Sequence, residues 1–234
     1  MPDDRPAKVT VGHLARAEQM CPRRLQKEHT NNQANWNANR RFRLSNQVTE
    51  EIRLVHTQLA SPRLDRFGAG TGLTPEQRQV YDLAIRWYVT LFTAPVRVVD
   101  EDQWGTDIPD GMRLVGPGGI PFTDADDQPE IRILSFGARP APATALVDHP
   151  AVRFAILRRV EWLAGRPVRV AIADLVRGTY DDATIDTTAV LPALDDWLTE
   201  RIDVIRTRIA SPTPMVGLEC AWCPYIAGCP PHRS

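Results

Sequence analysis

The sequence predicts an α+β fold, and three observations support it. Apolar residues recur at helical spacing over the first ninety residues and again near the C-terminus. Between these regions lie short strand-like runs, separated by Gly, Pro and Asp. The chain has 234 residues, of which 43% are hydrophobic and 24% charged. Since these proportions are typical of soluble globular proteins, we expect one domain with a substantial core.

Three helices are expected in the N-terminal part of this domain, residues 1–94. Thr10 can cap a first helix that is interrupted near Pro22, because proline removes a backbone donor. Residues 29–47 are rich in Asn and Arg and read as a loop. Ser45 can cap a second helix. Thr74-Pro75-Glu76-Gln77 predicts the start of a third, since it pairs a capping Thr with Gln three residues later.

The middle part, residues 95–180, is expected to form a sheet, and residues 181–234 a helix followed by a cysteine-rich tail. Two further helices are expected, at about 150–164 and 191–209. The predicted order is therefore helices, three strands, a helix, a strand and a helix. The strand-like runs are 95–99, 112–115, 130–136 and 168–176.

Charge is unevenly distributed although the net charge is only -1, which excludes a strongly basic nucleic-acid binder. Residues 16–43 hold seven Lys or Arg against two Glu, a net charge of +5. Residues 100–130 hold nine acids against one Arg, a net charge of -8. The first segment could follow a phosphate backbone and the second would repel one. Equally, both could be solvated surfaces of opposite sign.

Neither a membrane span nor a secretory signal is expected. No apolar run approaches the roughly 18 residues that a span requires. The opening MPDDRPAK is not followed by an apolar stretch. We therefore expect a cytoplasmic protein with reduced thiols.

The four cysteines form the most specific pattern in the chain. Cys220, Cys223 and Cys229 lie within ten residues, and Cys21 is about 200 residues upstream. A CxxC pair can bring two thiolates to one metal or cluster. Cys21 would then complete four ligands and clamp the first helices to the tail, so that metal binding contributes to folding. An iron–sulfur cluster, a zinc ion and unrelated cysteines all remain open.

Cys21 within the segment CPRRLQ, together with the tail pattern CxxC-x5-CP, resembles the iron–sulfur RecB-type nucleases of the PD-(D/E)XK superfamily. This family includes AddB-type subunits of helicase–nuclease machines and CRISPR adaptation exonucleases. Residues 51–59, with His56, look like its His-containing helix, and residues 119–136 like its central hairpin. The resemblance implies a small mixed sheet flanked by helices and a structural [4Fe-4S] cluster.

The resemblance also implies metal-dependent hydrolysis of DNA, for which this chain lacks the side chains. In the family's pattern Phe122 stands at the first carboxylate, Ser135 at the second and Gly137 at the lysine. Phe and Gly cannot bind Mg²⁺ or transfer a proton. The only lysines, Lys8 and Lys27, lie far from these positions in sequence. The catalytic centre is therefore expected to be degenerate.

Relocated ligands are the alternative that would preserve activity. They would be drawn from His56, Asp100, Glu101, Asp124 and Glu130. Asp124 is too close to Glu130 for the family's hairpin, and the cluster around it reads as a solvated turn. His56 reads as a helix residue with another hydrogen-bond partner.

The sequence thus predicts a catalytically inactive protein that binds DNA or acts as a scaffold in a helicase–nuclease or defence complex. Trp36 could stack on a base of single-stranded DNA, or pack on the domain. The alternatives are an active Mg²⁺- or Mn²⁺-dependent exonuclease and a protein-interaction module without DNA contact. The residues expected to contact DNA are Arg23, Arg24, Lys27, Trp36, Arg40, Arg41 and Arg43.

Overall fold

The structure is a computed structural model that describes residues 7–30, 40–68, 70, 72–99, 105–108, 112–116, 118–136, 145–215, 220, 223 and 229. The described helices are α1 (Val11–Ala15), α2 (Pro22–Thr30), α3 (Arg40–Val55), α4 (Pro75–Leu91), α5 (Pro150–Leu157), α6 (Val160–Leu163) and α7 (Thr187–Ala210). The described strands are β1 (Ala7–Val9), β2 (Arg97–Val98), β3 (Gly105–Ile108), β4 (Met112–Val115), β5 (Ile120–Thr123), β6 (Pro129–Ser135), β7 (Val168–Asp174) and β8 (Thr179–Ile185). Mixed helix and strand confirm the α+β class.

The chain forms two compact units, each assembled from separate stretches of sequence. Unit 1 comprises residues 1–35, 103–116 and 192–234, and unit 2 comprises residues 36–102 and 117–191. Unit 1 contains a three-stranded sheet in the order β1-β4-β3, with β1 parallel and β3 antiparallel to β4. All four cysteines belong to unit 1.

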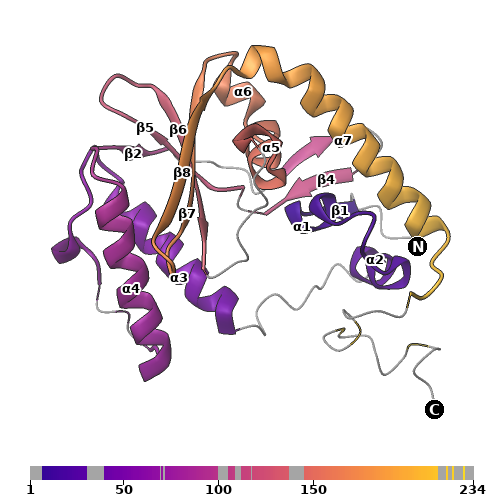
Figure 1. The fold of residues 1–234 in the computed structure, drawn as a ribbon, viewed down its shortest axis with the longest axis horizontal. Coiled ribbons are helices and arrows are strands. Elements are labelled where there is room, and N and C mark those ends of the chain that lie inside the picture. The colour runs from indigo at the N-terminus through magenta and orange to yellow at the C-terminus, as the bar shows by residue number, and fades with distance from the viewer. Residues whose placement is uncertain are drawn as a thin grey trace. The chain divides into compact units, whose positions relative to one another are not determined.

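Unit 2 contains a five-stranded sheet in the order β2-β5-β6-β7-β8. Only β6 and β7 are parallel, and the connection between them carries α5 and α6. The other neighbouring strands are antiparallel. Figure 1 shows α3 and α4 on one side of these strands and α5 and α6 on the other. The central strands are therefore covered on both faces, and this is where a parallel pair is usually found.

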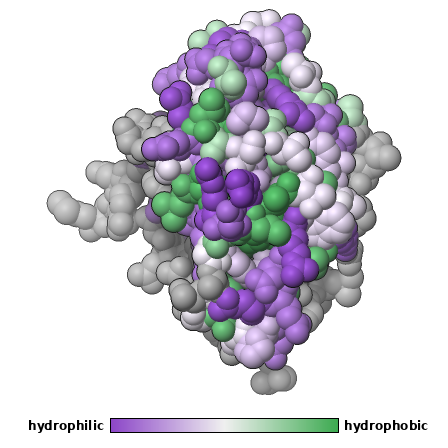
Figure 2. Space-filling view, turned by 90° about the vertical axis from the view of Figure 1, so that its left-hand side faces the viewer, coloured by the Kyte–Doolittle hydropathy of each residue, from purple (hydrophilic) through white to green (hydrophobic). Residues whose placement is uncertain are grey.

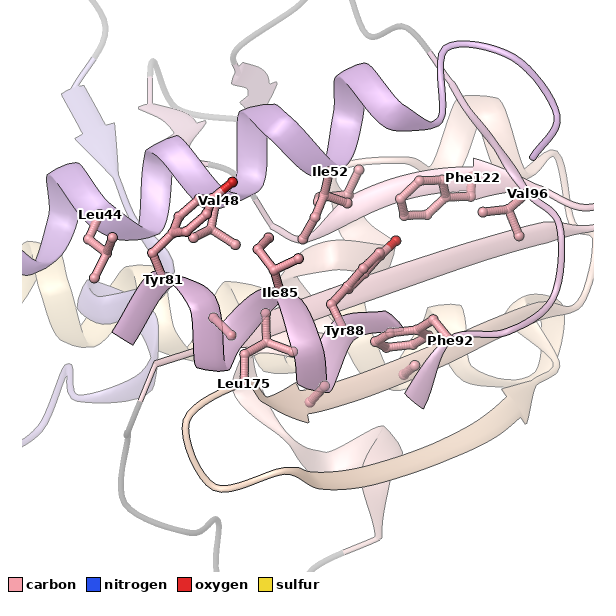
Figure 3. Close-up of a cluster of buried hydrophobic side chains, with 14 residues drawn as sticks. Leu44, Val48, Ile52, Tyr81, Ile85, Tyr88, Phe92, Val96, Phe122 and Leu175 are labelled. Atoms are coloured by element: carbon pink, nitrogen blue, oxygen red, sulfur yellow. The ribbon is translucent and has the colours of Figure 1, made fainter. Parts of the chain in front are cut away.

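The main core of unit 2 lies between α3, α4 and the sheet. It contains Tyr88 and Phe92 from α4 and Phe122 from β5, each at most 3% exposed. Figure 3 shows these rings gathered at one end of the cluster, beside Val96. Ala171 and Ala173 of β7 are small residues in the same cluster, so they leave room there for larger side chains from β6.

The helix predictions need four corrections. The N-terminal helix is two helices, and Pro22 begins the second, where its missing N–H costs nothing. α3 begins at Arg40 and not at Ser45, because arginine is a strong helix former, so the expected loop 29–47 was too long. The helix expected at 150–164 is broken into α5 and α6, and α7 begins four residues before 191.

The predicted strand order was wrong because four described strands are not among the predicted runs: β1, β3 and β8 were missed, and β5 was expected only from the resemblance of residues 119–136 to a hairpin. β1, β3 and β8 carry no clear apolar pattern, and β8 follows β7 directly as a hairpin. Most of β8 is exposed or half-buried and includes Asp181 and Asp182. An edge strand carries charge in this way and therefore reads as a loop in sequence. The run at 95–99 yields only the two-residue β2.

None of the helices in the described ranges is long and apolar enough to cross a membrane. Figure 2 shows one face of the molecule, on which apolar side chains lie among polar ones. The most exposed large apolar residues of unit 2 include Leu54, Leu59 and Leu64, between the end of α3 and the short helix that follows. Scattered apolar exposure of this kind is normal for a protein surface.

Candidate functional site

A chain of buried polar side chains crosses the core of unit 2. His56 follows the last turn of α3, Tyr88 lies on α4, and Glu130 and Arg132 lie on the central strand β6. The exposed fraction of each residue is 4% or less. Because buried polar groups are costly without partners, their hydrogen bonds define what this centre can do.

The donor and the acceptor can be assigned in each hydrogen bond around His56 and Tyr88. His56 Nδ1 lies 3.1 Å from the carbonyl oxygen of Val96, and since a carbonyl only accepts, Nδ1 donates. His56 Nε2 then accepts from the Tyr88 hydroxyl, 3.0 Å away. The Tyr88 oxygen in turn accepts from Arg132 Nη1 at 2.7 Å. Both imidazole nitrogens are therefore engaged with protein groups.

Arg132 forms a buried ion pair with the carboxylate two residues before it in sequence. Its Nε donates to Glu130 Oε1 at 2.5 Å. The second Glu130 oxygen, Oε2, lies 3.7 Å from Nη1 of Arg169, a partly exposed residue of β7. Arg169 also donates to Asp182 on β8 at 2.8 Å. The charge of Arg132 is thus compensated in the core, and the ion-pair chain continues to the surface.

Three aromatic rings surround the Arg132 guanidinium. Its central carbon lies 4.3 Å from the ring centroid of Phe92, 4.6 Å from that of Phe122 and 5.6 Å from that of Tyr88. Guanidinium groups are attracted to aromatic faces within about 6 Å of the centroid. The rings and Glu130 therefore form a cage for a cation, which Arg132 fills.

The surroundings of His56 keep it neutral. Burial, and then the charge of Arg132, lower its pKa from 6.5 to about 4, although carbonyls of Val96 and Ala60 oppose the change. Burial likewise raises the pKa of Tyr88 to about 12, against the opposing effect of Arg132. Neither group is poised to exchange a proton near neutral pH, so this centre lacks an obvious general acid or base.

Phe122, Ser135 and Gly137 are the three positions at which the resemblance predicts that catalytic side chains have been lost. Phe122 is fully buried, with its ring 5.3 Å from that of His56. Ser135 ends β6, and its hydroxyl donates to the Ala173 carbonyl at 3.4 Å. Gly137 lies outside the described residues. Phe122 therefore places a ring, and no ligand, beside His56.

The proposed relocated ligands are engaged elsewhere where they are described. His56 and Glu130 bond to Tyr88 and Arg132. Asp124 closes its own turn by accepting from the backbone N–H groups of Asp126 and Gln128, both at 2.9 Å. The remaining two residues, at positions 100 and 101, lie outside the described ranges. Across the described part of the chain, no three His, Cys, Asp or Glu side chains group to hold a metal ion.

The cysteines of unit 1 carry the right donor chemistry for a thiolate-bound group. None of the four is in a disulfide, and all are half-buried. The backbone of Met215 connects two of them, because its N–H donates to Cys21 Sγ at 3.4 Å and its carbonyl accepts from Cys220 Sγ at 3.7 Å. Cys223 N donates to the Cys220 carbonyl in the CxxC turn.

The surroundings of Cys21 lower the pKa of its thiol. Burial raises this pKa, but N–H groups of Met215, Arg24 and Arg23 bond to the sulfur, and with the charge of Arg23 they lower it overall. Cys21 directly precedes α2, and a helix N-terminus favours a negative sulfur. Sulfur ligands that accept N–H groups are typical of iron–sulfur and zinc sites, but among the described residues no three potential ligands converge.

The basic residues predicted to contact DNA fall into both units. Arg23, Arg24 and Lys27 lie on α2 in unit 1. Arg24 donates to Glu28 at 2.7 Å, and Glu28 also contacts His13, so one acid offsets part of this charge. The side chains of Arg40, Arg41 and Arg43, at the start of α3, are not described, and Trp36 lies outside the described residues.

Sequence reasoning missed Tyr88 and Arg132 as the partners of His56 and Glu130. A signal was nevertheless present, because Glu130 and Arg132 occupy alternate positions within an otherwise apolar strand. Two charges on one face of a buried strand must find partners. Tyr88 carried no such signal, since it continues the apolar stripe of its helix.

No protein-family model matches the chain, and no curated protein is significantly similar to it in sequence.

Proposed function

We propose that the protein is a RecB-type PD-(D/E)XK nuclease-like protein that does not cleave DNA. It would act as a DNA-binding or scaffolding subunit of a DNA-processing or defence complex. The observation that carries this proposal is the filled polar centre of unit 2. Where the resemblance expects the first carboxylate of a metal site, Phe122 is buried and apolar. Glu130, which was considered as a relocated ligand, is already paired with Arg132.

The sheet of unit 2 supports the first part of this proposal. Its order β2-β5-β6-β7-β8 begins with an antiparallel meander and adds β7 parallel to β6 through a helical connection. A small mixed sheet covered by helices on both faces is what the family resemblance implied.

The absence of catalysis is tested with the full chain and labelled single- and double-stranded DNA in the presence of Mn²⁺. We expect no degradation, because His56 has no vacant nitrogen and Phe122 offers no ligand. Degradation that is lost on chelation and survives repeated purification would contradict the proposal. It would instead favour the exonuclease with relocated ligands.

DNA binding is tested by a salt-dependent gel shift. Changing Arg23, Arg24, Arg40, Arg41 and Arg43 together to Ala should weaken the shift and reduce its salt dependence, since each phosphate contact releases counterions. A matched control removes five exposed or half-buried arginines elsewhere: Arg63, Arg78, Arg86, Arg97 and Arg177. Equal effects of the two sets would show that the predicted face is wrong, and no shift by the wild type would favour a protein-interaction module.

The same proposal includes a structural [4Fe-4S] cluster held by Cys21, Cys220, Cys223 and Cys229. Its support is the lowered pKa of the Cys21 thiol and the bonds of two of the cysteines to Met215. Protein purified without oxygen should be brown and contain iron and sulfide. Each Cys→Ser change should reduce the iron content, while Lys27→Ala, on the exposed side of α2, should not. A colourless protein with one zinc ion per chain would contradict the cluster and show that the cysteines bind zinc.

A further inference from the structure

We propose that Glu130 and the rings of Tyr88, Phe92 and Phe122 form an internal guanidinium-binding site that Arg132 occupies from within the chain. The site is specific for a planar, singly charged cation. It is an internal counterpart of a ligand pocket, and it does not rest on the proposed function. Removing the Arg132 side chain should convert it into a site for a guanidinium compound from solution.

The first support is the geometry of the polar groups. Glu130 Oε1 accepts from Arg132 Nε and the Tyr88 oxygen accepts from Nη1, at 2.5 and 2.7 Å. Two acceptors reached from different nitrogens of one planar group match the fixed fork of guanidinium. An ammonium ion is a compact point charge with a single nitrogen, so we expect it to fit these two acceptors less well than a guanidinium group.

The second support is the aromatic lining. The Phe92 and Phe122 centroids lie 4.3 and 4.6 Å from the guanidinium carbon, close enough for favourable contact with ring faces. Phe92 is the C-cap of α4 and Phe122 lies on β5, so the packing of this helix on the sheet brings the two rings together. Figure 3 shows both rings and Tyr88 gathered at the same end of the core.

The third support is that the site is buried and its charges balance. Arg132 and Glu130 have side chains 1% and 5% exposed. An unpaired carboxylate at that burial is strongly unfavourable, so Glu130 requires a cation. Arg169 approaches only to 3.7 Å from the far oxygen and is itself bonded to Asp182 and Tyr180, so it does not replace Arg132.

The test is chemical rescue of Arg132→Ala. We expect a fall in its thermal unfolding temperature, which millimolar methylguanidinium raises again in a saturable manner. The same concentration of methylammonium, which lacks the planar fork, or of methylurea, which lacks the charge, should give little recovery. Wild-type protein should not respond, because its site is full. Equal recovery with all three compounds, or with none of them, would overturn the proposal.

Two further variants make the result specific. Ile131→Ala opens an apolar cavity at the next residue of β6, which is fully buried and faces the opposite side of the strand. This control should lose stability without recovery by methylguanidinium. Adding Glu130→Gln to Arg132→Ala should abolish the preference for methylguanidinium over methylurea. Rescue of Ile131→Ala, or unchanged preference in the double variant, would contradict the assignment.

If Arg132→Ala does not fold, the proposed site can be tested by NMR on the wild-type protein. In a nitrogen-15 NMR spectrum, the Arg132 Nε–H should be shifted by the surrounding ring currents and should exchange slowly with water. Arg63, whose side chain is 69% exposed, provides the comparison within the same chain. Exchange of the Arg132 Nε–H as fast as that of Arg63 would show that the cage does not hold the guanidinium.

Discussion

At the scale of single residues, Arg132 explains why the centre of unit 2 tolerates so much polarity. Its guanidinium provides the positive charge for Glu130 and a donor for Tyr88, and the Tyr88 hydroxyl then donates a hydrogen bond to His56 Nε2. Each member is satisfied by the next, ending at the Val96 carbonyl. A fully satisfied network of this kind favours one arrangement of the core.

His56 makes stability depend on pH. Its pKa falls from 6.5 to about 4 on folding, so the unfolded chain binds a proton that the folded chain does not. The contribution of His56 to the free energy of unfolding is therefore fully present above pH 6.5 and is lost as the pH falls towards about 4. The slope contributed by this one residue should approach about 1.4 kcal/mol per pH unit in that interval.

Urea unfolding of wild type and His56→Gln between pH 7 and pH 4 measures this slope. Glutamine does not titrate, yet its amide can still accept from Tyr88. The difference in unfolding free energy between the two proteins should shrink steadily as the pH falls. Other titrating groups, such as Glu28, whose pKa is lowered by bonds to His13 and Arg24, are present in both proteins and cancel. A difference that stays constant with pH would contradict the prediction.

At the scale of elements, the turn between β7 and β8 is fitted closely to α4. Gly178 has a φ of +68°, and a Cβ placed on it would lie 2.4 Å from the Trp87 ring. Side chains rarely adopt that backbone conformation, and here the space is also occupied. The hairpin can therefore pack against α4 only with glycine at this position.

Gly178→Ala should destabilise the protein by about 1–3 kcal/mol, since both backbone strain and overpacking act. Urea unfolding measures the loss. Gly72→Ala is a matched control, because Gly72 has a φ of +78° and nothing within 4 Å of the added Cβ. It should show the smaller loss due to strain alone. Equal losses in the two variants would mean that Trp87 moves aside without cost.

At the scale of the whole molecule, the proposed cluster site and the buried polar centre belong to different units. The cysteines lie in unit 1, whereas the caged arginine and its partners lie in unit 2. Each unit has its own sheet. A perturbation at the cysteines is therefore expected to act mainly on unit 1.

Removal of iron by a chelator tests this separation by hydrogen exchange. If the cysteines hold a cluster, exchange should accelerate in α1, α2 and the sheet of unit 1, because cluster binding is part of the folding energy there. Amides of β6 and β7 in unit 2 should keep their protection. Faster exchange throughout the chain would show that the two units unfold together.

The sequence predicted the α+β class, the sites of most helices, and the strands that contain β4, β6 and β7, because each has a strong local pattern. It also predicted that His56 has a hydrogen-bond partner, and the structure shows two, the Val96 carbonyl and the Tyr88 hydroxyl. It could not predict β8, whose exposed side chains follow no apolar alternation. The predicted cluster ligands and DNA contacts remain predictions.

What the sequence alone determined was chemical: four cysteines, three of them within ten residues, and Phe122, Ser135 and Gly137 at positions for which the proposed resemblance predicts acids and a lysine. Only the tertiary structure decided what fills the centre of unit 2. The cage draws residues from α4, β5 and β6, which are separated in sequence by up to 44 positions. Whether a buried arginine is compensated depends on groups that only folding brings within a few ångströms, because the interactions are short-ranged and local patterns do not record them.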